Sequence, residues 1–346
     1  MTLHDGISWP ALLTILLNGE HLSEQQAANA LGVIMRGEAT PVEVAAFLVA
    51  LRAKGETSEE IAGFVRAMLA HAERLELDGV LVDTCGTGGD RAGTFNISTI
   101  AALVVAAAGV QVAKHGNRAA SGRCGSADLL EAWGVAIDLP PTAVGECVAE
   151  VGIGFLFARR FHPAMRHVAA VRAELGVPTV FNVLGPLTNP AGIERQVVGV
   201  ADARLAPLVA DALVHLGRRH ALVFRGEDGL DELTTTGPSR LWEIRDGRAT
   251  ESLFDPASLG LPRSRREDLV GGEVEENARI AEAVLAGEPG PGADVVALNA
   301  AAALYVSGTA PRIRDGLEMA RDVLTSGAAG KLRDRWVAVS QELAGG

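Results

Sequence analysis

The sequence predicts an α/β protein in which a small all-helical domain precedes a large α/β domain with a mostly parallel central sheet. Residues 1–73 carry capped, apolar-periodic segments of helical length and no strand-like run. From residue 77 onward, short β-branched runs alternate with apolar helical segments, which is typical of a parallel sheet with crossover helices. Only 4% of the residues are aromatic, so the core must consist mainly of Ala, Val and Leu, which suits helices packed on such a sheet.

Four short helices are expected in the first domain, separated by glycines and turn-length loops. The expected N-caps are Ser8, before Trp9-Pro10; Ser23; Thr40, before Pro41; and Thr57 or Ser58, and the first three helices are expected to stop at Gly19, Gly37 and Gly55. Acidic residues follow the fourth cap, where they interact favourably with the positive end of the helix dipole. Four helices with short connections predict a small bundle.

The second domain is expected to alternate strands and helices. Including the loops that follow them, the expected strands lie at 80–90, 110–117, 135–137, 153–161, 195–201 and 220–229. Helices are expected at 97–109, 125–134, 141–152 and 204–217, and residues 275–343 are expected to be mostly helical. The segment 241–252 predicts an antiparallel hairpin, because Asp246-Gly247 supplies the backbone angles that a two-residue turn needs.

One segment interrupts this alternation. Residues 162–192 carry a helical pattern and several prolines, and we interpret residues 163–188 as a helical excursion back to the first domain. The predicted division is therefore a helical domain of residues 1–75, joined by the excursion, and an α/β domain of residues 76–162 and 189–346.

Charge and cysteine content restrict the classes of partner. A formal net charge of −12 makes the chain a poor binder of nucleic acid or of an anionic membrane. Three cysteines without a CxxC pair are typical of reduced thiols in a cytoplasmic protein. No signal-like segment opens the chain, and the longest apolar runs, at 100–109 and 300–306, are far shorter than the ~20 residues of a membrane helix. We expect a soluble cytoplasmic protein.

The stretch DTCGTGGDRAGTFNIST, residues 83–99, is the first candidate site. Glycines between a strand and a helix let backbone N–H groups converge on an anion, but an ordinary tight turn uses the same residues. GTGGD matches neither the dinucleotide fingerprint nor the Walker loop, so it gives little support for a nucleotide cofactor. Asn96, Ser98 and Thr99 stand at the expected helix start, where they either cap the helix or contribute hydrogen bonds and a metal contact beside a phosphate.

The loop KHGNRAASGRCGSAD is the second candidate. Lys114, His115, Arg118 and Arg123 occur in it before the first acidic residue, Asp128, against the acidic balance of the whole chain. Charge-assisted hydrogen bonds from such cations to phosphate oxygens are strong. A solvated basic loop remains the alternative.

The remaining candidates each carry two interpretations. Arg172 falls on the apolar stripe of an expected helix, either as a snorkelling side chain or as a fork for the carboxylate of an aromatic acid. Asp231 and Glu232 follow a strand and a glycine turn, and such a pair either holds Mg²⁺ or forms a solvated turn. His162 is expected near a helix cap, and zinc is not expected because no HExxH or paired cysteine spacing occurs.

In this order along the chain, GTGGD, FNIST, KHGNR, SGRCGSADLLEAWG, FHPAM, FNVLGPLTNPA and DGLDE resemble the anthranilate phosphoribosyltransferase family of tryptophan biosynthesis. The resemblance also includes the first domain and the segment 276–308, so it covers essentially the whole chain. It implies a fold of the nucleoside phosphorylase and phosphoribosyltransferase type, a homodimer formed through the helical domain, and an excursion that is part of the hinge. The implied reaction transfers the phosphoribosyl group of phosphoribosyl pyrophosphate (PRPP) to the amino nitrogen of anthranilate.

The resemblance also implies roles for single residues. Anthranilate would contact Gly86, Asn117 and Arg172, and the cofactor Mg²⁺ would be held by Ser98, Asp231 and Glu232. PRPP would contact Gly86, Gly89, Asp90, Thr94, Asn96, Ile97, Ser98, Thr99, Lys114, His115, Gly116, Asn117, Arg118, Ala119, Ala120, Ser121, Gly122 and Ser126. No residue is assigned as an acid, a base or a nucleophile. Cys124 stands where the family pattern has serine, and a thiol is a weak hydrogen-bond partner.

Two other functions remain open on the sequence. One is a pyrimidine nucleoside phosphorylase of the same fold, which the KHGNR and DGLDE motifs disfavour. The other is a catalytically silent relative that binds nucleic acid, which the acidic charge and the intact carboxylate pair disfavour. Phosphorolysis of a nucleoside without PRPP would reveal the first, and a salt-dependent shift of DNA would reveal the second.

Overall fold

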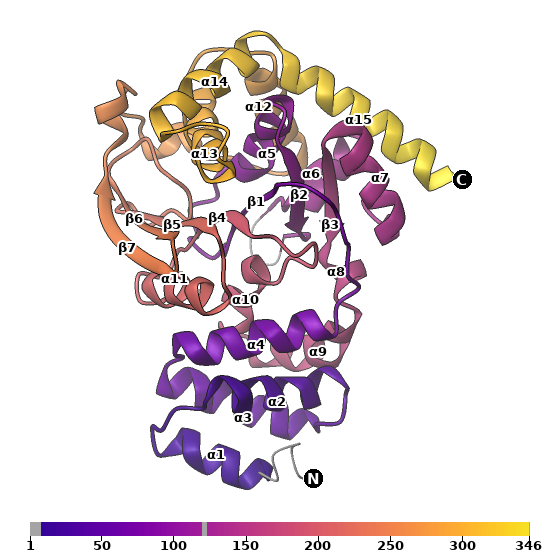
Figure 1. Cartoon of the computed structure of the whole chain (residues 1–346), viewed down its shortest axis with the longest axis vertical. Coiled ribbons are helices and arrows are strands. Elements are labelled where there is room, and N and C mark those ends of the chain that lie inside the picture. The colour runs from indigo at the N-terminus through magenta and orange to yellow at the C-terminus, as the bar shows by residue number, and fades with distance from the viewer. Residues whose placement is uncertain (1–7, 120–122, 346) are drawn as a thin grey trace.

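The computed structural model of the chain describes residues 8–119 and 123–345. At one end, four helices form the predicted bundle, which we call the helical lobe (Figure 1). These helices are α1 (Trp9–Leu17), α2 (Glu24–Met35), α3 (Pro41–Lys54) and α4 (Ser58–Ala70). The predicted caps Ser8, Ser23 and Thr40 are confirmed, and Thr57 rather than Ser58 caps α4. At α2, α3 and α4 the third helical side chain also bonds the cap N–H, which satisfies two backbone donors at each start.

Seven strands form one sheet in the order β3-β2-β1-β4-β5-β6-β7. Five of them are parallel: β1 (Leu81–Gly86), β2 (Gln111–Gly116), β3 (Ile153–Phe157), β4 (Arg195–Gly199) and β5 (His220–Gly226). The mostly parallel sheet is therefore confirmed, as is the antiparallel hairpin, which consists of β6 (Ser239–Arg245) and β7 (Arg248–Phe254). Asp246 and Gly247 form its turn with φ angles of 52° and 73°.

The strand predicted at 135–137 is wrong. These residues lie in an irregular loop between α6 (Ser126–Ala132) and α7 (Pro141–Val151). Val135 and Ile137 are buried in the core, and the backbone N–H of Ala136 donates to the Ser340 hydroxyl oxygen at 3.1 Å. The apolar run thus reflects burial beside the C-terminal helix, which a run of three residues does not distinguish from a buried strand.

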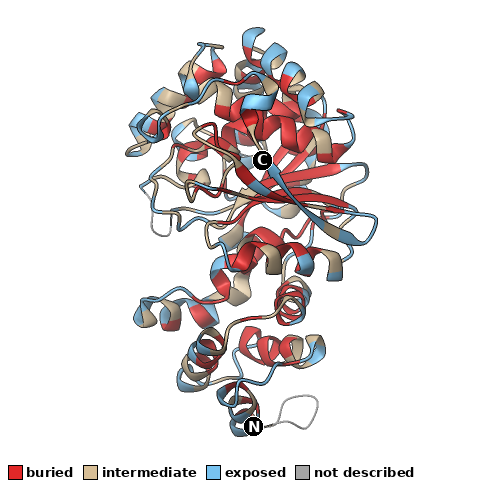
Figure 2. Ribbon diagram, turned by 90° about the vertical axis from the view of Figure 1, so that its left-hand side faces the viewer, coloured by how far each residue is buried: buried red, intermediate tan, exposed pale blue. Residues whose placement is uncertain are grey.

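Helices cover both faces of the sheet (Figure 1). One face shares a core with α5 (Ile97–Ala107), α6, α7, α12 (Val274–Leu285), α13 (Pro291–Ser307), α14 (Ile313–Thr325) and α15 (Ala328–Gly345). The opposite face shares a core with α11 (Leu205–His215) and with the helical lobe. Figure 2 shows most of the strands as a buried layer, whereas the edge strand β7 is largely exposed. Within the described part of the chain, no helix combines the length and the apolar character needed to cross a membrane.

The excursion between β3 and β4 packs against the helical lobe. It contains α8 (Ala158–Phe161), a 3-10 turn (Pro163–Met165), α9 (Arg166–Leu175) and α10 (Phe181–Leu187). Helix α9 contacts α2 and α3, and α10 contacts α4 and α11. Because Val168 and Leu184 are fully buried in the core that continues under the sheet, the lobe and this face of the sheet form one hydrophobic body. The domain boundaries at residues 75, 162 and 188 stay a prediction.

The strand order reverses between β1 and β4. From β1 the chain proceeds outward to β2 and β3, whereas from β4 it proceeds outward to β5 on the other side. In open α/β sheets, ligands bind outside the carboxyl ends of the strands at such a reversal. Gly86 and Gly199 end these two strands and pair with each other. We call residues 86–99, 114–119, 123–126 and 226–236, which end or follow β1, β2 and β5 at this edge, the switch-point site.

Candidate active site

Two glycines allow the loop after β5 to reach the ends of β1 and β4. A Cβ atom at Gly199 would lie 1.6 Å from the backbone oxygen of Asp231, and a Cβ atom at Gly86 would lie 2.3 Å from its Oδ2 atom. The backbone N–H of Gly88 donates to the same Oδ2 atom at 2.7 Å. The Asp231 carboxylate is therefore held against bare backbone in the switch-point site.

Burial raises the proton affinity of the acidic pair. It raises the pKa of Asp231 to about 7, and the neighbouring Asp90 carboxylate adds to this shift while the Gly88 N–H opposes it. Burial, followed by the charge of Asp231, also raises the pKa of Glu232 well above its usual value. The Oδ2 atom of Asp90 is buried and has no hydrogen-bond partner among the described residues. The adjacent Asp231 and Glu232 carboxylates thus lie in a site that disfavours their simultaneous ionisation.

The donor set fits Mg²⁺. Carboxylate and hydroxyl oxygens are hard ligands of the kind that this ion prefers. The backbone of Ser98 lies close enough to Glu232 to oppose the rise in the pKa of that carboxyl, so the start of α5 adjoins the acidic pair. Among the residues that the structure describes, no three His, Cys, Asp or Glu side chains converge closely enough to hold a metal by themselves. This also suits Mg²⁺, which keeps several waters and shares the phosphate oxygens of a substrate.

Lys114 is buried, and its ammonium group faces the protein backbone. Its Nζ atom donates to the carbonyl oxygen of Thr84 at 2.6 Å and lies 3.5 Å from Oγ of Ser98. Burial lowers its pKa, and the charge of Asp83 opposes that shift. The positively charged group of Lys114 therefore lies beside Ser98 and β1. Its shorter hydrogen bond goes to the protein backbone, at Thr84.

Asp83 and Asn189 form a buried network that the sequence analysis did not find. One oxygen of the Asp83 carboxylate accepts the His115 backbone N–H at 3.2 Å, and the other accepts from Nδ2 of Asn189 at 2.9 Å. Asn189 also donates to the carbonyl oxygen of Ala113 at 2.8 Å. Because the two residues are 106 positions apart, no local pattern could have identified the pair.

Asn96 occupies the N-cap position of α5, as expected, but its side chain does not cap the helix. Its Nδ2 atom instead donates to the backbone oxygen of Cys124 at 3.1 Å. Its Oδ1 atom is buried and unpartnered within the described part of the chain. Because the bond uses the backbone of Cys124, the thiol at this position does not remove it. The remaining predicted residues of this loop, Gly89, Asp90, Thr94, Ile97, Ser98 and Thr99, lie before α5 or in its first turn.

The second candidate loop closes on itself next to the first. The Ser126 hydroxyl and the Ala127 backbone N–H both donate to the carbonyl oxygen of Asn117 at 3.2 Å. A Cβ atom at Gly116 would lie 2.2 Å from the Ser126 hydroxyl oxygen, so this glycine permits the closure. The predicted PRPP residues Ala120, Ser121 and Gly122 lie outside the described residues.

Arg118 is paired with carboxylates. Its guanidinium donates to Asp128 at 3.0 Å and to Glu131 at 2.7 Å. Arg123 is exposed and lies 3.7 Å from Glu273. The local excess of positive charge that the sequence indicated is therefore largely compensated by acids from other turns and elements.

Arg172 projects from α9 without a carboxylate partner among the residues that the structure describes. Its guanidinium lies 5.1 Å from the ring centroid of Phe181. The side chain is partly buried, and burial is the only resolved cause of its lowered pKa, so no acid in the described ranges compensates its charge. An uncompensated guanidinium that rests on an aromatic face is preorganised to receive a carboxylate.

His162 lies against His115, a contact that the sequence analysis missed. Their ring centroids are 5.1 Å apart, and Nδ1 of His115 lies 3.1 Å from the carbonyl oxygen of Gly185. Burial lowers the pKa of His115 to about 3 and that of His162 to about 4, so both rings are neutral at pH 7. A carbonyl oxygen only accepts, so the proton of His115 resides on Nδ1.

A distant segment, residues 266–273, braces the glycine loop, and we call it the strap. The backbone N–H of Phe95 donates to Leu269 at 3.2 Å, and that of Gly271 donates to Gly93 at 2.8 Å. A Cβ atom at Gly271 would lie 2.8 Å from Cα of Phe95, so the approach of the two backbones depends on this glycine. Paired glycines in a loop far along the chain were the only sequence signal for it.

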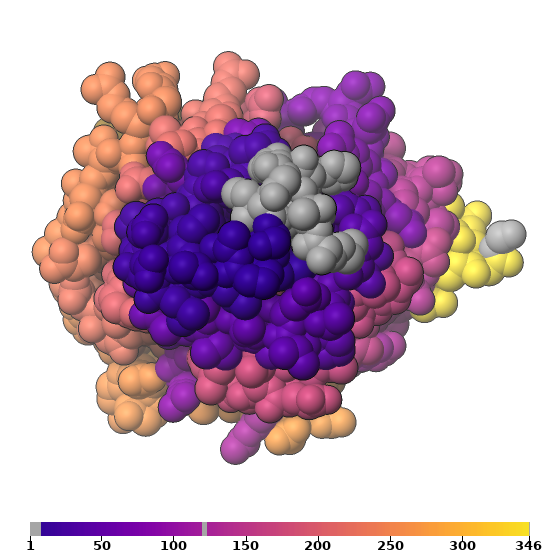
Figure 3. All heavy atoms as spheres, turned by 90° about the horizontal axis from the view of Figure 1, so that it is seen from below, coloured from indigo at the N-terminus to yellow at the C-terminus, as the bar shows by residue number. Residues whose placement is uncertain are grey.

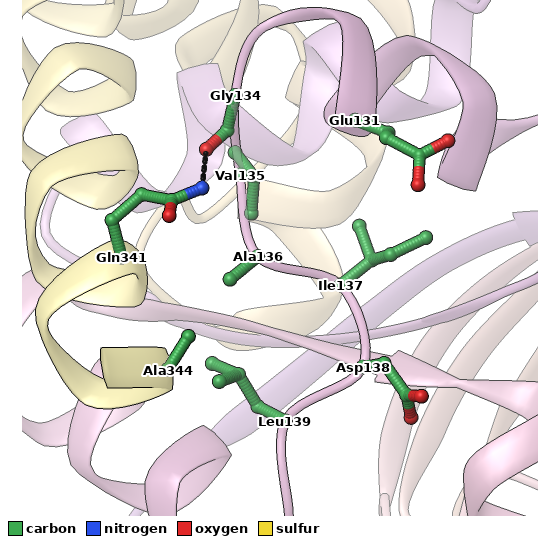
Figure 4. A pocket seen from close by; sticks show the side chains of 9 residues that line it. All are labelled: Glu131, Gly134, Val135, Ala136, Ile137, Asp138, Leu139, Gln341 and Ala344. Atoms are coloured by element: carbon green, nitrogen blue, oxygen red, sulfur yellow. Dashed lines mark hydrogen bonds between the residues drawn. The ribbon is translucent and has the colours of Figure 1, made fainter. Parts of the chain in front are cut away.

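A hollow of about 330 Å³ lies elsewhere, between the loop 134–139 and α15 (Figure 4). Its lining consists mostly of small and aliphatic side chains, and Gln341 donates across it to the carbonyl oxygen of Gly134 at 2.6 Å. It contains none of the predicted site residues, and we assign it no part in the chemistry.

Two family descriptions match the two parts of the chain. The "Glycosyl transferase family, helical bundle domain" matches residues 10–72. The "Glycosyl transferase family, a/b domain" matches residues 78–330, which is more than half of the chain.

Similar proteins agree over nearly the full length. The anthranilate phosphoribosyltransferase of an Arthrobacter species is 52% identical over 342 residues, with 97% of each chain covered. The crystal structure of the Thermus thermophilus enzyme of the same name is 50% identical with a TM-score of 0.90, and covers 95% of this chain and 99% of that one. The Saccharomyces cerevisiae enzyme in complex with PRPP and Mg is 30% identical with a TM-score of 0.88, and covers 96% and 98%.

Proposed function

This chain belongs to the anthranilate phosphoribosyltransferase family, and from that premise we propose how its own residues carry out the reaction. The chain is a pentosyltransferase of tryptophan biosynthesis. It transfers the phosphoribosyl group of PRPP to the amino nitrogen of anthranilate, which yields N-(5-phosphoribosyl)anthranilate and pyrophosphate. The observation that best supports our assignment of the site is the carboxylate cluster at the end of β1, where the sheet reverses its strand order.

We assign the metal site to Asp231, Glu232 and Ser98. Their oxygens fit Mg²⁺, and a bound cation would compensate the negative charge of the two buried carboxylates, whose pKa values are raised by burial. The Saccharomyces cerevisiae relative was solved with PRPP and Mg, which supports the same requirement here. When bound, the ion would offset negative charge on the departing pyrophosphate.

PRPP would occupy the glycine loop and the start of α5. Backbone N–H groups at the positive end of a helix bind phosphate well. The Oδ1 atom of Asn96, which has no partner within the described ranges, is a suitable acceptor for a ribose hydroxyl. Lys114 supplies a positive charge next to Ser98. We retain the other PRPP contacts implied by the family motifs, except that Arg118 is assigned to holding the second loop through Asp128.

Anthranilate would bind with its carboxylate at Arg172 and its ring near Asn117 and Gly86. The guanidinium of Arg172 has no competing acid in the described part of the chain, so a substrate carboxylate would compensate its charge. Because Arg172 belongs to the excursion while PRPP lies on the sheet edge, the two substrates approach from two parts of the fold. Closure of these parts would exclude water, which otherwise competes for the same ribose carbon.

The chemistry then consists of positioning and electrostatic stabilisation. The amino nitrogen of anthranilate attacks C1 of the ribose with inversion, while the C1–O bond to pyrophosphate breaks. Oriented reactants and preorganised charges account for such catalysis without a covalent nucleophile. We assign no general base, because the aniline nitrogen already has a lone pair and can lose its proton after the bond forms.

We also propose that two copies associate through the helical lobe. Leu17 and Val42 in α1 and α3 are 76% and 77% exposed, and Val49 on α3 is 47% exposed. Figure 3 views the molecule from this end, where the lobe covers the centre of the face. Apolar side chains exposed together on one small bundle are typical of an interface. The three cysteines, which are unpaired, support a cytoplasmic location.

The test of the proposed reaction is the loss of anthranilate fluorescence when the protein is mixed with anthranilate, PRPP and Mg²⁺. We expect a metal-dependent loss that stops when either substrate is omitted. Asp231→Ala combined with Glu232→Ala should abolish turnover or raise the Mg²⁺ requirement. Competent substrates that show no metal-dependent change with the wild-type protein would reject the proposal.

A further inference from the structure

The loop that carries Asp231 and Glu232 is held from outside by one residue of α13. We propose that Asn299 is a positioning residue for the metal-binding carboxylates, an inference that rests on the metal site proposed above. Asn299 is 2% exposed and belongs to a helix that contacts β1, β4 and β5. Its side-chain hydrogen bonds within the described residues go to backbone groups, and none goes to a residue proposed to bind substrate.

The Asn299 side chain clamps the peptide groups of Leu233, the residue that follows Glu232. Its Oδ1 atom accepts the Leu233 backbone N–H at 3.0 Å, and its Nδ2 atom donates to the Leu233 carbonyl oxygen at 2.9 Å. Nδ2 also donates to the carbonyl oxygen of Val295 at 2.9 Å, within its own helix. The amide thus bonds both backbone groups of Leu233, as a neighbouring strand would, with its second N–H fixed by α13.

This clamp attaches the backbone of the loop to a helix, whereas several other bonds of the loop stay within it. Asp228 accepts from the hydroxyls of Thr234 and Thr236 at 2.8 Å and 2.5 Å, which stiffens the loop internally without attaching it to the sheet or the helices. The Asn299 bonds join residues 66 positions apart and attach the loop to α13. Together with the Gly88 N–H bond to Asp231, they set where the loop lies relative to β1 and β4.

The metal site has little tolerance for a displaced loop. A Cβ atom at Gly199 would lie 1.6 Å from the Asp231 backbone oxygen, so this backbone already packs tightly against the end of β4. Glu232 stands between Asp231 and the clamped Leu233. Loss of the clamp would leave the buried N–H and carbonyl groups of Leu233 without partners, and the loop would shift to satisfy them. The carboxylates would then lose their common geometry.

Asn299→Leu removes both bonds to Leu233 and keeps the number and branching of the side-chain heavy atoms, and Asn299→Ser keeps one hydroxyl as a milder variant. Residues that orient metal ligands typically contribute about 10- to 100-fold to metal affinity. We therefore expect Asn299→Leu to raise the Mg²⁺ concentration for half-maximal activity about tenfold or more, with the KM for anthranilate within about twofold of wild type. Asn299→Ser should fall between wild type and leucine, and it replaces the leucine variant if that protein does not fold.

The matched control is Ser340→Ala on α15. Ser340 is also fully buried, and its hydroxyl oxygen accepts the backbone N–H of Ala136 in the remote loop of Figure 4 at 3.1 Å. This substitution removes a long-range side-chain brace of the same kind from a loop outside the switch-point site. It should lower the melting temperature without changing the Mg²⁺ requirement.

A binding measurement separates this inference from the proposed reaction. PRPP is titrated calorimetrically at several Mg²⁺ concentrations without anthranilate, so that no turnover occurs. We expect the Kd for PRPP of Asn299→Leu to exceed that of wild type about tenfold at low Mg²⁺ and to approach it at saturating Mg²⁺.

An equal increase at every Mg²⁺ concentration, or no Mg²⁺-linked binding by the wild-type protein, would overturn the role of Asn299. Wild-type protein that binds PRPP with Mg²⁺ but transfers nothing would reject the reaction and leave the inference standing if the variant shows the expected shift.

Discussion

The backbone N–H of Gly88 donates a 2.7 Å hydrogen bond to the Asp231 carboxylate, and this bond joins the loops after β1 and β5 across 143 residues. It brings the phosphate-binding type of loop and the acidic pair into one site. Gly86 and Gly199 make the contact sterically possible, because a side chain at either position would overlap Asp231.

The first prediction concerns the stability of the metal-free protein against pH. The pKa of Asp231 is raised from 3.8 to about 7, so between these values the folded state holds a proton that the unfolded state releases. Stability therefore decreases as pH rises through this range, and Asp231→Asn removes the part of the decrease that Asp231 contributes. In the presence of a chelator, we expect Asp231→Asn to gain melting temperature relative to wild type between pH 4 and pH 7.

The comparison must be made as a difference between the two proteins. The lowered pKa values of His115 and His162, about 3 and about 4 against 6.5, contribute stability that increases with pH over part of the same range. These residues are present in both proteins, so the difference cancels their contribution and reports Asp231 together with the effect of its charge on Glu232. A constant difference in melting temperature across pH 4 to 7 would contradict the raised pKa.

The second prediction concerns Gly199. A Cβ atom there would lie 1.6 Å from the Asp231 backbone oxygen, so Gly199→Ala must displace the loop that carries the acidic pair. We expect a loss of about 3 kcal/mol in the free energy of unfolding, as overpacking in a rigid site produces, and a higher Mg²⁺ requirement. Urea denaturation and activity against Mg²⁺ concentration measure the two effects.

Gly237→Ala is the control for this substitution, because a Cβ atom at Gly237 meets no atom of the described residues within 4 Å. It should leave both the midpoint of unfolding and the Mg²⁺ dependence close to wild type. Equal effects at the two glycines would show that backbone flexibility, and not the contact with Asp231, is what Gly199 provides.

The third prediction concerns Arg172. Removal of a charged hydrogen-bonding partner typically costs about 1.5–3 kcal/mol, so Arg172→Ala should raise the KM for anthranilate about 10- to 100-fold and that for PRPP much less. Arg172→Lys should recover only part of the loss, because an ammonium lacks the fork that matches a carboxylate. Arg166→Ala, an exposed arginine of the same helix, serves as the control and should change neither KM. A parallel rise in both KM values would argue against a carboxylate clamp.

The fourth prediction concerns the helical lobe. Val42 is 77% exposed on α3, and a charge in the centre of an apolar interface is strongly unfavourable. Val42→Asp should therefore shift sedimentation velocity from a dimer toward a monomer, while Leu253→Asp, at a 65% exposed position on β7, should not. A wild-type protein that sediments as a monomer at micromolar concentration would refute the proposed dimer.

Much of the local structure was predictable because its causes lie within a few residues. Ser23, Thr40 and Thr57 specify helix starts through bonds to the third helical residue, and Asp246-Gly247 specifies a hairpin turn through its φ angles. The alternation of short strands and helices was sufficient to predict the parallel sheet. The strand predicted at 135–137 was wrong because a run of three apolar residues is equally typical of a buried loop and of a paired strand.

The candidate site could be predicted in part. Glycine runs, the acidic pair and Arg172 are visible in the sequence because each carries an unusual residue type for its position. The roles of Asn189, the strap and Asn299, and the contact of His162 with His115, are not visible, since an amide or an imidazole in a helix or loop has many ordinary roles. The compensation of Arg118 is also not visible, because a basic loop residue gives no sign in the sequence that Asp128 and Glu131 pair with it.

The sequence by itself therefore determined the helical starts, the turn of the hairpin, the class of fold and, through its ordered motifs, the family. The tertiary structure alone decided that Asp231 packs against Gly199, that Lys114 faces Thr84, and that α13 holds the loop of the acidic pair. The physical reason is range: caps and turns depend on neighbours in the chain, whereas these contacts depend on the strand order, which brings residues together regardless of their separation in sequence.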